Sequence, residues 1–501
     1  MNAPLDASMN APMNAPRIAP ARPRRAPTRP CLAAALAAAA LASACSMLSP
    51  PAAPAAPADR APATPPAWQS PSASGSSLAD QSWRTFFAYG DLPALIDEAL
   101  RANRDLRIAA ERIELARAQY GLARSALVPT IAADASATAQ RGPTPLDPNR
   151  NRSGESYSAG LAMPTWEIDL WGRIRSQVDA ARLNVEATEA QRRAAEVSLV
   201  ASVAGSWLEL LEIDQQLAVS RRTRDSRRDS LRLIRLRFQA GVVSMVDVTQ
   251  AETSLAQADQ AIADLERRRS LGESALSLLL GRNPGPIART QGLREMPVPT
   301  VLPAGLPSDL LRRRPDIIAA ERSMAATEAD VDAARKAFLP SISLSGFLGV
   351  VSPQLSQLLG ADRAAWSVTP GVTLPIFTGG RLESNLDATA ARQRIAIEDY
   401  GRTVQGALRD VEDALAGFQR RREQREALER IVASSQERLR LVDLRYLNGI
   451  SSYFEVLDSQ RVLFDAELQL AQATAATYGS VIQLYRALGG GWDPAAVAAG
   501  R

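Results

Sequence analysis

The sequence contains no histidine and only two cysteines among its 501 residues. Both cysteines, Cys31 and Cys45, lie near the N-terminus. Beyond residue 45 the chain therefore has neither an imidazole nor a thiol, which excludes histidine and cysteine metal sites, histidine-activated nucleophiles and disulfide bonds there. The glycine-rich stretch 489–491 lacks the lysine of a phosphate-binding loop. We therefore expect that the protein is not an enzyme and that it has no catalytic residue, metal site or cofactor.

The chain also lacks a basic run of the kind that binds nucleic acids. Its formal charge of +4 arises within residues 1–44, where five arginines accompany a single acid, Asp6. The rest of the chain carries equal numbers of basic and acidic side chains. The sequence therefore favours no nucleic-acid partner.

The N-terminus has the organisation of an export signal. An apolar run at 31–44 has the length of a signal-peptide core and is too short to span a bilayer as a helix. We interpret residues 1–44 as a signal peptide with an N-terminal extension. The run ends in LASAC, which resembles the lipobox of bacterial lipoproteins, although Ala42 stands where a larger aliphatic residue is usual.

This match predicts that Cys45 is the lipidated first residue of the mature chain. An ordinary signal peptide with an incidental cysteine is the alternative. Residues 45–78 consist mostly of proline, alanine and serine, a composition that predicts a semi-extended tether rather than a packed segment.

Proline placement indicates that the body is duplicated. Fifteen of the 33 prolines lie in residues 1–78, whereas the stretches 165–283 and 376–493 contain none. An offset of 208 residues aligns the two stretches without a gap, for example Gly172 with Gly380. We therefore divide the chain after the tether into repeat 1 at 79–303, repeat 2 at 304–492 and a tail at 493–501.

In most of each repeat, apolar residues recur every three or four positions, as in amphipathic helices. A continuous helix over 172–238 would be about 100 Å long and must lie against other helices, because no single globular core is that long. The predicted helices are 93–128, 172–238 and 246–281 in repeat 1, and 308–337, 380–447 and 453–488 in repeat 2.

A shorter part of each repeat alternates apolar and polar residues, as strands do. The predicted strands are 130–140 and 156–166 in repeat 1, and 341–350 and 365–376 in repeat 2, with polar loops at 141–155 and 351–363. Their length and pattern suit outer-membrane strands, and a half-buried soluble sheet shows the same alternation. Four strands cannot close a barrel, so a membrane-spanning sheet would need several chains.

Several segments resemble hallmark motifs of one known family. They are WEIDLWGRIRSQVDAA, LPSDLLRRRPDIIAAE, ARKAFLPSISLSG, LPIFTGGR and RYLNGISSYFEVLDSQR. Together they resemble the outer membrane factors, the TolC and OprM-like channels, and among them the NodT-type efflux lipoproteins. The resemblance runs from Trp83 to Trp492 and covers both repeats.

The resemblance implies a mainly α fold with a transmembrane β part. Four strands from each chain of a homotrimer would form a 12-stranded barrel in the outer membrane, continued by a long α-helical periplasmic barrel of coiled-coil hairpins. It also implies three kinds of partner: a periplasmic adaptor (membrane fusion) protein, an inner-membrane pump and outer-membrane lipid.

We therefore expect a passive exit duct of a tripartite efflux system, lipid-anchored in the bacterial outer membrane and extending into the periplasm. Type I protein secretion is an alternative function for the same duct. An envelope hydrolase is disfavoured because it would need a nucleophile and a base, and the chain beyond residue 45 has no histidine and no thiol. A structural lipoprotein is disfavoured because it would need no transmembrane strands, and four strands are predicted.

Three groups of residues are candidate functional sites. At the junction of strand and helix, Trp166 and Trp171 suit either an aromatic belt at the membrane interface or core packing. Gly172, Gly379 and Gly380 would permit the change of backbone direction there.

The two hairpin turns are the second group. The family uses these turns to meet the adaptor, and small residues would let its helices approach, whereas an ordinary helix–helix turn also needs glycine. The candidate docking residues are Gly241, Val242, Ser244, Gly449, Ile450 and Ser452.

The third group is a candidate periplasmic gate near the second turn. Leu439, Arg440, Asp443 and Arg445 lie within two helical turns of the tip, where an acid and bases could pair within or between chains. Related channels narrow near this position with an Asp and an apolar ring. A solvated helix end with solubilising charges is the alternative.

Replacing Cys45 by serine should abolish acylation, since the thiol is the acyl acceptor. Metabolic labelling with radioactive palmitate measures this directly. Because the barrel itself would hold the protein in the membrane, we expect efflux to persist in Cys45→Ser. An unlabelled parent protein would contradict the assignment.

Overall fold

The computed structural model describes residues 63–72, 77–144, 147–297, 302–360 and 362–490. The chain divides into two compact units, Met1–Pro54 and Ala55–Arg501, and all described residues belong to the second. The expected signal peptide, Cys45 and the tail at 493–501 lie outside the described residues.

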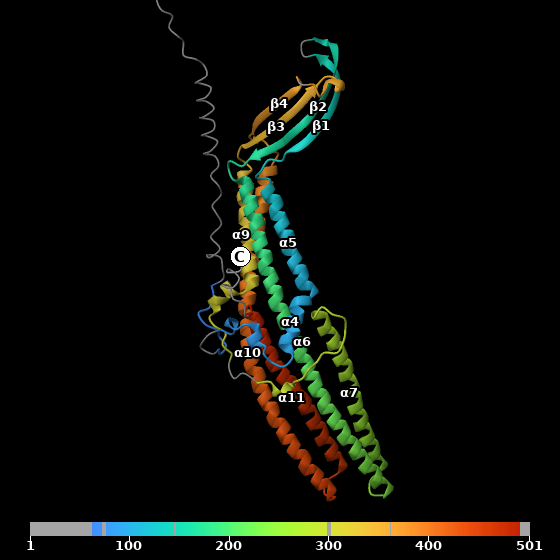
Figure 1. Cartoon of the computed structure of the whole chain (residues 1–501). Helices are drawn as coiled ribbons and strands as arrows, with labels where there is room; N and C mark the ends of the chain where they lie inside the picture. The colour runs from blue at the N-terminus through green and yellow to red at the C-terminus, as the bar shows by residue number, and fades with distance from the viewer. Residues whose placement is uncertain (1–62, 73–76, 145–146, 298–301, 361, 491–501) are drawn as a thin grey trace, which may run out of the picture. The chain divides into compact units, whose positions relative to one another are not determined.

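Two pairs of long helices are the largest elements of the second unit (Figure 1). The pairs are α6 (Arg173–Gln239) with α7 (Met245–Leu279), and α10 (Arg381–Leu447) with α11 (Tyr453–Ala487). Helices α6 and α10 have 67 residues each, and α7 and α11 have 35 each. Each helix of the second pair begins 208 residues after its counterpart, the offset that aligns the repeats in the sequence.

Each expected shorter helix is interrupted once. The elements are α4 (Leu92–Ala102) and α5 (Arg104–Ser125) in repeat 1, and α8 (Leu310–Arg313) and α9 (Pro315–Lys336) in repeat 2. The first break occurs because Asn103 is extended and its side-chain oxygen accepts the Leu106 N–H as an N-cap. The second occurs because Pro315 forces the preceding Arg314 out of the helical region.

The four strands form one antiparallel sheet in the order β1-β2-β3-β4. Their bounds are Ala132–Thr144, Asp147–Ile168, Ser341–Ser352 and Ala364–Thr373. The expected loop at 141–155 is largely strand, because main-chain pairing continues through Arg152 opposite Gly142 and Asn151 opposite Pro143. The alternation of apolar and polar side chains ends before residue 141, so the sequence pattern did not indicate that the strands continue.

The remaining elements are short, of three or four residues each, and the last of them connects β3 to β4. They are η1 (Leu78–Asp80), α3 (Trp83–Phe86), η2 (Leu293–Glu295), η3 (Pro307–Asp309) and η4 (Leu355–Gln357). Figure 1 shows the sheet at one end of the long helices and the α6–α7 and α10–α11 turns at the opposite end.

The core lies where both repeats meet around the middle of the long helices. One cluster joins α4, α6 and α11 around the buried side chains of Ile96, Trp207 and Tyr485, and a second joins α9, α10 and α11 around Val411 and Leu484. Among the described helices, α6 alone is long and apolar enough to cross a membrane, and half of its most apolar stretch is buried. Contacts with α4, α5, α7, α9 and α11 account for that apolarity as core packing.

Part of the expected tether packs on the body instead. The Trp68 indole donates to the Gly305 carbonyl at 2.8 Å, and the Ser70 N–H donates to the Glu412 carboxylate at 2.7 Å. Leu78 is buried in the second cluster. Trp68 also packs against this cluster, so apolar contacts of both side chains hold the segment against the second repeat.

The linker between the repeats is fixed by a buried arginine. The Arg289 side chain is only 4% exposed, and its guanidinium contacts Asp214 of α6 at 2.5 Å and Glu273 of α7 at 2.9 Å. Charge-assisted hydrogen bonds of this kind are stronger than neutral ones, so they hold the linker against the first hairpin.

Glycine at position 281 ends α7 in a left-handed conformation, with φ of 75°. A Cβ there would overlap the Ala102 carbonyl oxygen at the end of α4. Gly241 has a similar φ of 73°, but a Cβ there would meet nothing within 4 Å.

Gly281→Ala should therefore lower the melting temperature more than Gly241→Ala does. Both variants incur the roughly 1–2 kcal/mol strain of a left-handed residue, and only Gly281→Ala must also displace backbone. Thermal unfolding of the two purified proteins compares them, and equal melting temperatures would contradict the close approach of α7 to α4.

Candidate functional site

The register of the sheet sorts apolar and polar side chains onto opposite faces. Leu161 lies opposite Leu348, and Leu348 lies opposite Trp366, so one apolar row crosses three strands. Ile168, Ile342 and Val372 form a second such row. The other face carries Ser136, Ser158, Ser343, Ser345 and Thr369, with Phe347 and Val351 as apolar exceptions.

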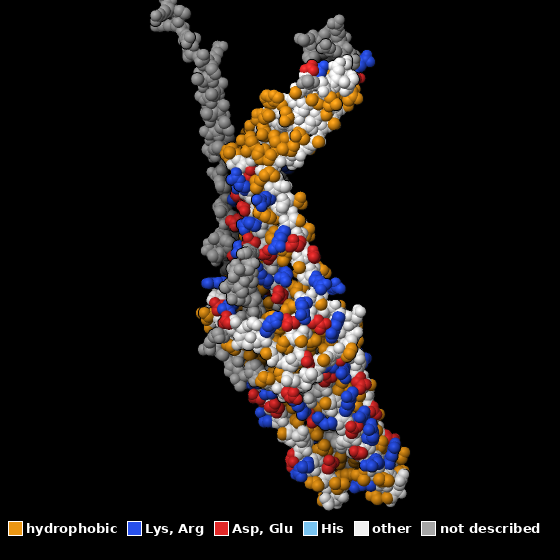
Figure 2. Space-filling model, viewed as in Figure 1, with side chains coloured by type: hydrophobic (Ala, Val, Ile, Leu, Met, Phe, Trp, Pro, Cys, Tyr) orange, Lys and Arg blue, Asp and Glu red, His pale blue; other side chains and the backbone are white. Residues whose placement is uncertain are grey.

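The apolar face is exposed rather than packed against a helix. Trp366 is 75% exposed, and Leu348, Val368 and Val372 are exposed as well. Figure 2 shows hydrophobic side chains gathered over the sheet, in contrast to the mixed charges over the helices. On the polar face, the hydroxyls of Ser136 and Ser158 hydrogen-bond at 2.8 Å. One apolar and one polar face is the arrangement of a strand between lipid and a water-filled lumen.

The sheet is open at both edges within the single chain. In the described residues, β1 pairs only with β2 and β4 pairs only with β3. The outer N–H and C=O groups of β1 and β4 therefore need partners from outside the chain wherever water is excluded.

The junctions between strands and long helices use glycine in both repeats. Gly172 and Gly380 are the N-caps of α6 and α10, with φ of 77° and 80°, and Gly379 is also left-handed. Sequence reasoning missed Asp169, whose carboxylate accepts the N–H groups of Ile174 and Arg175. An acid just before a helix start was the available signal.

The two candidate tryptophans differ in their surroundings. Trp171 is 43% exposed, and its indole donates to the Pro340 carbonyl at 2.7 Å. Trp166 is half-buried in β2 opposite Leu344, and its indole nitrogen has no acceptor among the described residues. Trp171 therefore ties the start of α6 to the start of β3, while Trp166 belongs to the apolar face of the sheet.

Lys336, the only lysine in the sequence, fixes the first junction. Its ammonium contacts the Gly172 carbonyl at 3.3 Å, the Ser176 hydroxyl at 2.8 Å and the Asp332 carboxylate at 2.5 Å. A compact ammonium suits three acceptors so close together better than a planar guanidinium does. This contact ties α9 of repeat 2 to α6 of repeat 1.

The two hairpin turns have the same geometry. Gly241 and Gly449 are left-handed, and the next residues, Val242 and Ile450, donate their N–H groups to carbonyls five residues back. Val242 is 70% exposed and Ile450 is 67% exposed. Around them lies an exposed apolar patch, the tip patch, which consists of Leu236, Phe238, Val242, Met245, Val246, Leu444, Leu447, Ile450 and Phe454.

The serines of the two turns differ. Ser244 forms a capping box with Asp247 at the start of α7, so its hydroxyl is part of the helix cap. Ser452 also precedes a helix, but its side chain makes no capping hydrogen bond. Ser452 can therefore be replaced without loss of a cap, whereas Ser244 cannot.

The four candidate gate residues do not pair with one another within the chain. Arg440 is exposed and pairs with Glu437 at 2.7 Å. Asp443 and Arg445 form no ion pair with the described residues, and burial raises the pKa of the Asp443 carboxyl. Sequence reasoning missed Glu437, although its spacing of three residues from Arg440 was a signal for that pair.

Leu439 belongs to an apolar cluster that joins the two hairpins near their tips. The cluster includes Ile234 of α6, Val248 of α7 and Tyr453 of α11. Burial raises the pKa of Tyr453 to about 12, so this phenol stays neutral. Arg237 of α6 stacks 4.7 Å from the ring of Tyr446 on α10.

A family model described as outer membrane efflux protein matches residues 95–282 and 306–490, one stretch in each repeat. The chain belongs to the outer membrane efflux protein family. It is 39% identical over 425 residues to outer membrane protein OprJ of Pseudomonas aeruginosa, an alignment that covers 84% of this chain and 88% of OprJ. It is 37% identical over 434 residues to the probable efflux pump outer membrane protein TtgC of Pseudomonas putida, covering 85% of this chain and 88% of TtgC.

The fold of this outer membrane efflux protein matches a solved channel. A structure of the outer-membrane channel OprN superimposes with a TM-score of 0.80 at 30% identity, covering 88% of this chain and 100% of that one. The expected family, the fold class and the function as an outer-membrane efflux channel are thereby confirmed, and the family is one of channels. The sheet, with one exposed apolar face and one polar face, is the part of this protein whose surface fits a lipid environment.

Adjacent residues in β4 offer a matched test of the two faces. Val368→Arg should place a charge against lipid at a cost of about 2–4 kcal/mol, and so reduce the amount of folded protein in outer-membrane fractions. Thr369→Arg lies on the polar face and should assemble normally while changing ion selectivity in planar bilayers. Equal losses of folded protein in both variants would contradict the assignment of faces.

Proposed function

We propose that this chain is the passive exit duct of a tripartite efflux system and works as a homotrimer. The exposed apolar face and the two open edges of the sheet are the observation that carries this proposal. Three copies would join β1 of one chain to β4 of the next in a twelve-stranded barrel, and a closed barrel leaves no unpaired edge. Relatives named as antibiotic and toluene efflux pump outer membrane proteins support small molecules as the cargo.

The helical part also supports assembly between copies. Ile108, Leu115 and Leu122 are exposed on α5 at intervals of seven residues. This spacing produces an apolar seam along one side of a helix. Since α5 packs mainly on α6 within the chain, the seam is available to a helix of a neighbouring copy.

A deletion strain complemented with the gene tests the duct directly. Loss of the gene should increase accumulation of a fluorescent pump substrate, and the wild-type gene should restore export. If accumulation stays at the parental level while export of a type I secreted protein fails, the secretion alternative replaces this proposal.

The tip patch is the proposed docking surface for a periplasmic adaptor. Exposed leucine, valine, methionine and phenylalanine side chains at the far end from the sheet suit the apolar tip of a partner helical hairpin. The left-handed glycines keep each turn compact without a side chain. An inner-membrane pump would then act through the adaptor, since a passive duct needs an external energy source.

Ser452→Trp should weaken adaptor binding about tenfold, because a large ring would prevent close approach of the partner helix. Ser452 is preferable to Ser244, where a bulky residue would also remove a cap. Ser270→Trp changes an exposed serine of α7 that lies far along the helix from the turn, and is the control. Binding to immobilised adaptor measures the effect, and unchanged affinity with full efflux would count against docking at the tips.

The ends of α10 near the second turn are the proposed gate. Asp443 is half-buried and forms no ion pair among the described residues. In a trimer its carboxylate could therefore form an ion pair with Arg440 or Arg445 of a neighbouring copy. Leu439 would add an apolar ring. Exposed pairs contribute only about 0.2–1 kcal/mol each, which adaptor binding could overcome.

The double variant Arg440→Ala/Asp443→Ala should raise single-channel conductance in planar bilayers and increase susceptibility to large antibiotics. Arg409→Ala/Asp413→Ala likewise removes one arginine and one aspartate from the same helix, far from the tip, and should leave conductance unchanged. A gate variant as tightly closed as the parent would place the constriction elsewhere.

A further inference from the structure

An aromatic cavity lies where the two repeats meet. Its volume is about 330 Å³, at the lower end of the range for small-molecule pockets, so it suits a single ring better than a long segment. The residues after α3, the helices α6 and α11, and the linker between the repeats all contribute to its wall. The lining includes Phe86, Phe87, Tyr89, Trp207, Tyr478 and Ile482.

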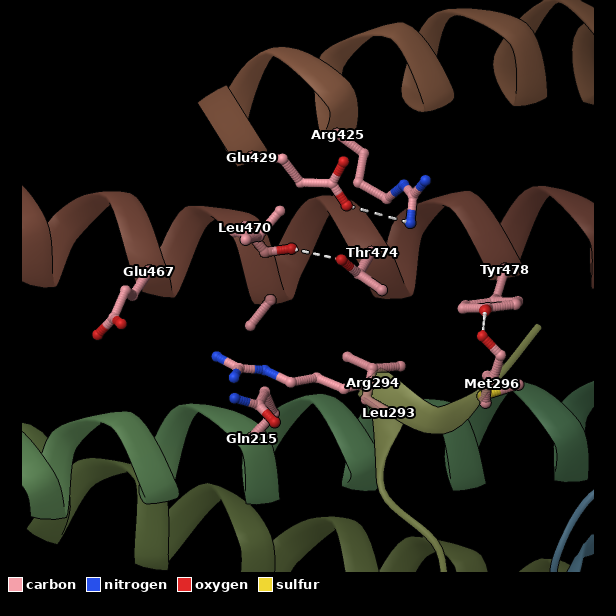
Figure 3. Close-up of a pocket in the computed structure, with 11 residues that line it drawn as sticks. Gln215, Leu293, Arg294, Met296, Arg425, Glu429, Glu467, Leu470, Thr474 and Tyr478 are labelled. Atoms are coloured by element: carbon pink, nitrogen blue, oxygen red, sulfur yellow. Dashed lines mark hydrogen bonds and ion pairs between the residues drawn. The ribbon is translucent and has the colours of Figure 1, made fainter. Parts of the chain in front are cut away.

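The polar atoms of these aromatic side chains are turned away from the cavity. The Tyr89 hydroxyl donates to the Gly292 carbonyl at 2.9 Å, and the Tyr478 hydroxyl donates to the Met296 carbonyl (Figure 3). Trp207 is only 1% exposed, and its indole nitrogen is buried. The aromatic wall therefore offers rings rather than hydrogen bonds, and it selects an apolar occupant.

The mouth of the cavity is an incompletely covered edge of the core. Phe86 and Tyr89 pack against the first core cluster but are only half-buried. Next to them, Thr85 and Ala88 are exposed and also line the cavity. Covering partly exposed rings with a further apolar side chain is favourable, because it removes apolar surface from water.

The described chain ends beside this cavity, inside the core. Gly490 follows α11 and is buried, and a Cβ there would lie 2.8 Å from the Val197 side chain and 3.2 Å from the Tyr485 hydroxyl. The Tyr485 ring in turn stacks on Phe86, with 5.2 Å between the centroids, and meets Phe87 edge-on at 5.0 Å. One aromatic ring therefore separates the end of the described chain from the wall of the cavity.

The C-terminal segment, residues 491–501, lies outside the described residues and contains one aromatic residue, Trp492. Two residues extend a chain by at most about 7 Å, and a tryptophan side chain adds a similar reach. Ile482, on the cavity wall, precedes Gly490 by eight residues, which corresponds to about 12 Å along a helix. The indole of Trp492 can therefore reach the aromatic cavity.

A second cavity is a poorer match for this indole. It has a volume of about 260 Å³, lies on the other side of Tyr478, and is lined by charged side chains (Figure 3). Arg425 and Glu429 form an ion pair at 3.4 Å there. Its wall on α11 begins at Tyr478 and continues away from Gly490 to Glu467, so even its nearest point is about 18 Å from Gly490 along the helix. This cavity is both too distant and too polar.

We propose that Trp492 inserts its indole ring into the aromatic cavity, so that the C-terminal segment is an intramolecular strap. The ring packs against Phe86 and Tyr89 and covers the edge of the core. Because Trp492 follows α11 of repeat 2, while the cavity wall includes α6 of repeat 1, the strap ties the two repeats together. This role is independent of the proposed transport path.

A disulfide between Thr85→Cys and Asp493→Cys tests the contact in the full-length protein. Beyond residue 45 the sequence has no cysteine of its own, and Thr85 is exposed at the mouth. Membranes that contain this double variant are oxidised and digested with trypsin. Mass spectrometry should then detect peptides 85–101 and 487–501 joined by a disulfide, and a denaturing, non-reducing gel should show the oxidised protein at the size of one chain.

Variants of the cysteine pair separate insertion of the ring from mere proximity. Trp492→Ala should lower the disulfide yield several-fold, because no ring then holds position 493 at the mouth, whereas Trp492→Phe should keep most of the yield. Ala88→Trp, at an exposed position of the wall, should obstruct the cavity and lower the yield as well. Ser270→Trp, on the exposed side of α7, is the matched control and should leave the yield unchanged.

A disulfide within one chain whose yield depends on both Trp492 and an open cavity establishes the strap. Absence of the disulfide in the parent pair overturns the proposal. An undiminished yield in Trp492→Ala or in Ala88→Trp also overturns it, because the segment would then lie near the mouth without inserting its ring. A disulfide found only between two chains would assign the segment to a neighbouring copy and overturn the intramolecular contact.

Discussion

The open edges of a four-stranded sheet impose the constraint on which the rest of the structure depends. In hydrocarbon no water is present to satisfy the outer N–H and C=O groups of β1 and β4, and each unsatisfied group costs several kcal/mol. The side-chain register makes lipid the natural neighbour of one face, since leucine, isoleucine, valine and tryptophan align across the strands. In a membrane, such a sheet would need strands from other copies to complete it. Because of the duplication, each copy contributes two strand hairpins, β1–β2 and β3–β4. A few copies would therefore provide enough strands for a closed barrel.

A few local interactions fix the junctions between the strands and the helices that follow them. Helices α6 and α10 each start at a left-handed glycine a few residues after a strand, so the direction of the chain changes there. The first junction is additionally fixed by Lys336, Asp169 and Trp171. At the far end, the repeated glycine turns reverse the chain and leave their apolar side chains in solvent. The two repeats therefore carry the two-faced sheet at one end and the exposed tip patch at the other.

Much of this architecture could be predicted from the sequence. The ends of the long helices lie within two residues of the predicted ones, because glycine and small polar residues mark them. The extension of β2 through residues 147–155 could not be predicted, since main-chain pairing rather than side-chain alternation forms it. The sequence does contain signals for the breaks at Asn103 and Pro315, an N-cap residue and a proline. The apolar period continues through both positions, so each region was predicted as one helix. The spacing of Glu437 and Arg440 was a signal for their pair, but which partner Arg440 takes, Glu437 or Asp443, depends on side-chain conformations that spacing alone leaves open.

Disulfide cross-linking of β1 to β4 between copies tests the central claim most directly. One cysteine replaces Thr369 on the polar face of β4, and a second replaces in turn each of Asp134, Ser136 and Thr138 on the same face of β1. Neighbouring strands bring such cysteines within the reach of a disulfide in one register. We predict that one of these variants, oxidised in outer membranes, gives covalent species of two and three chains and none larger. Absence of intermolecular products in every register, or a ladder that continues beyond three chains, would contradict a barrel shared by three copies.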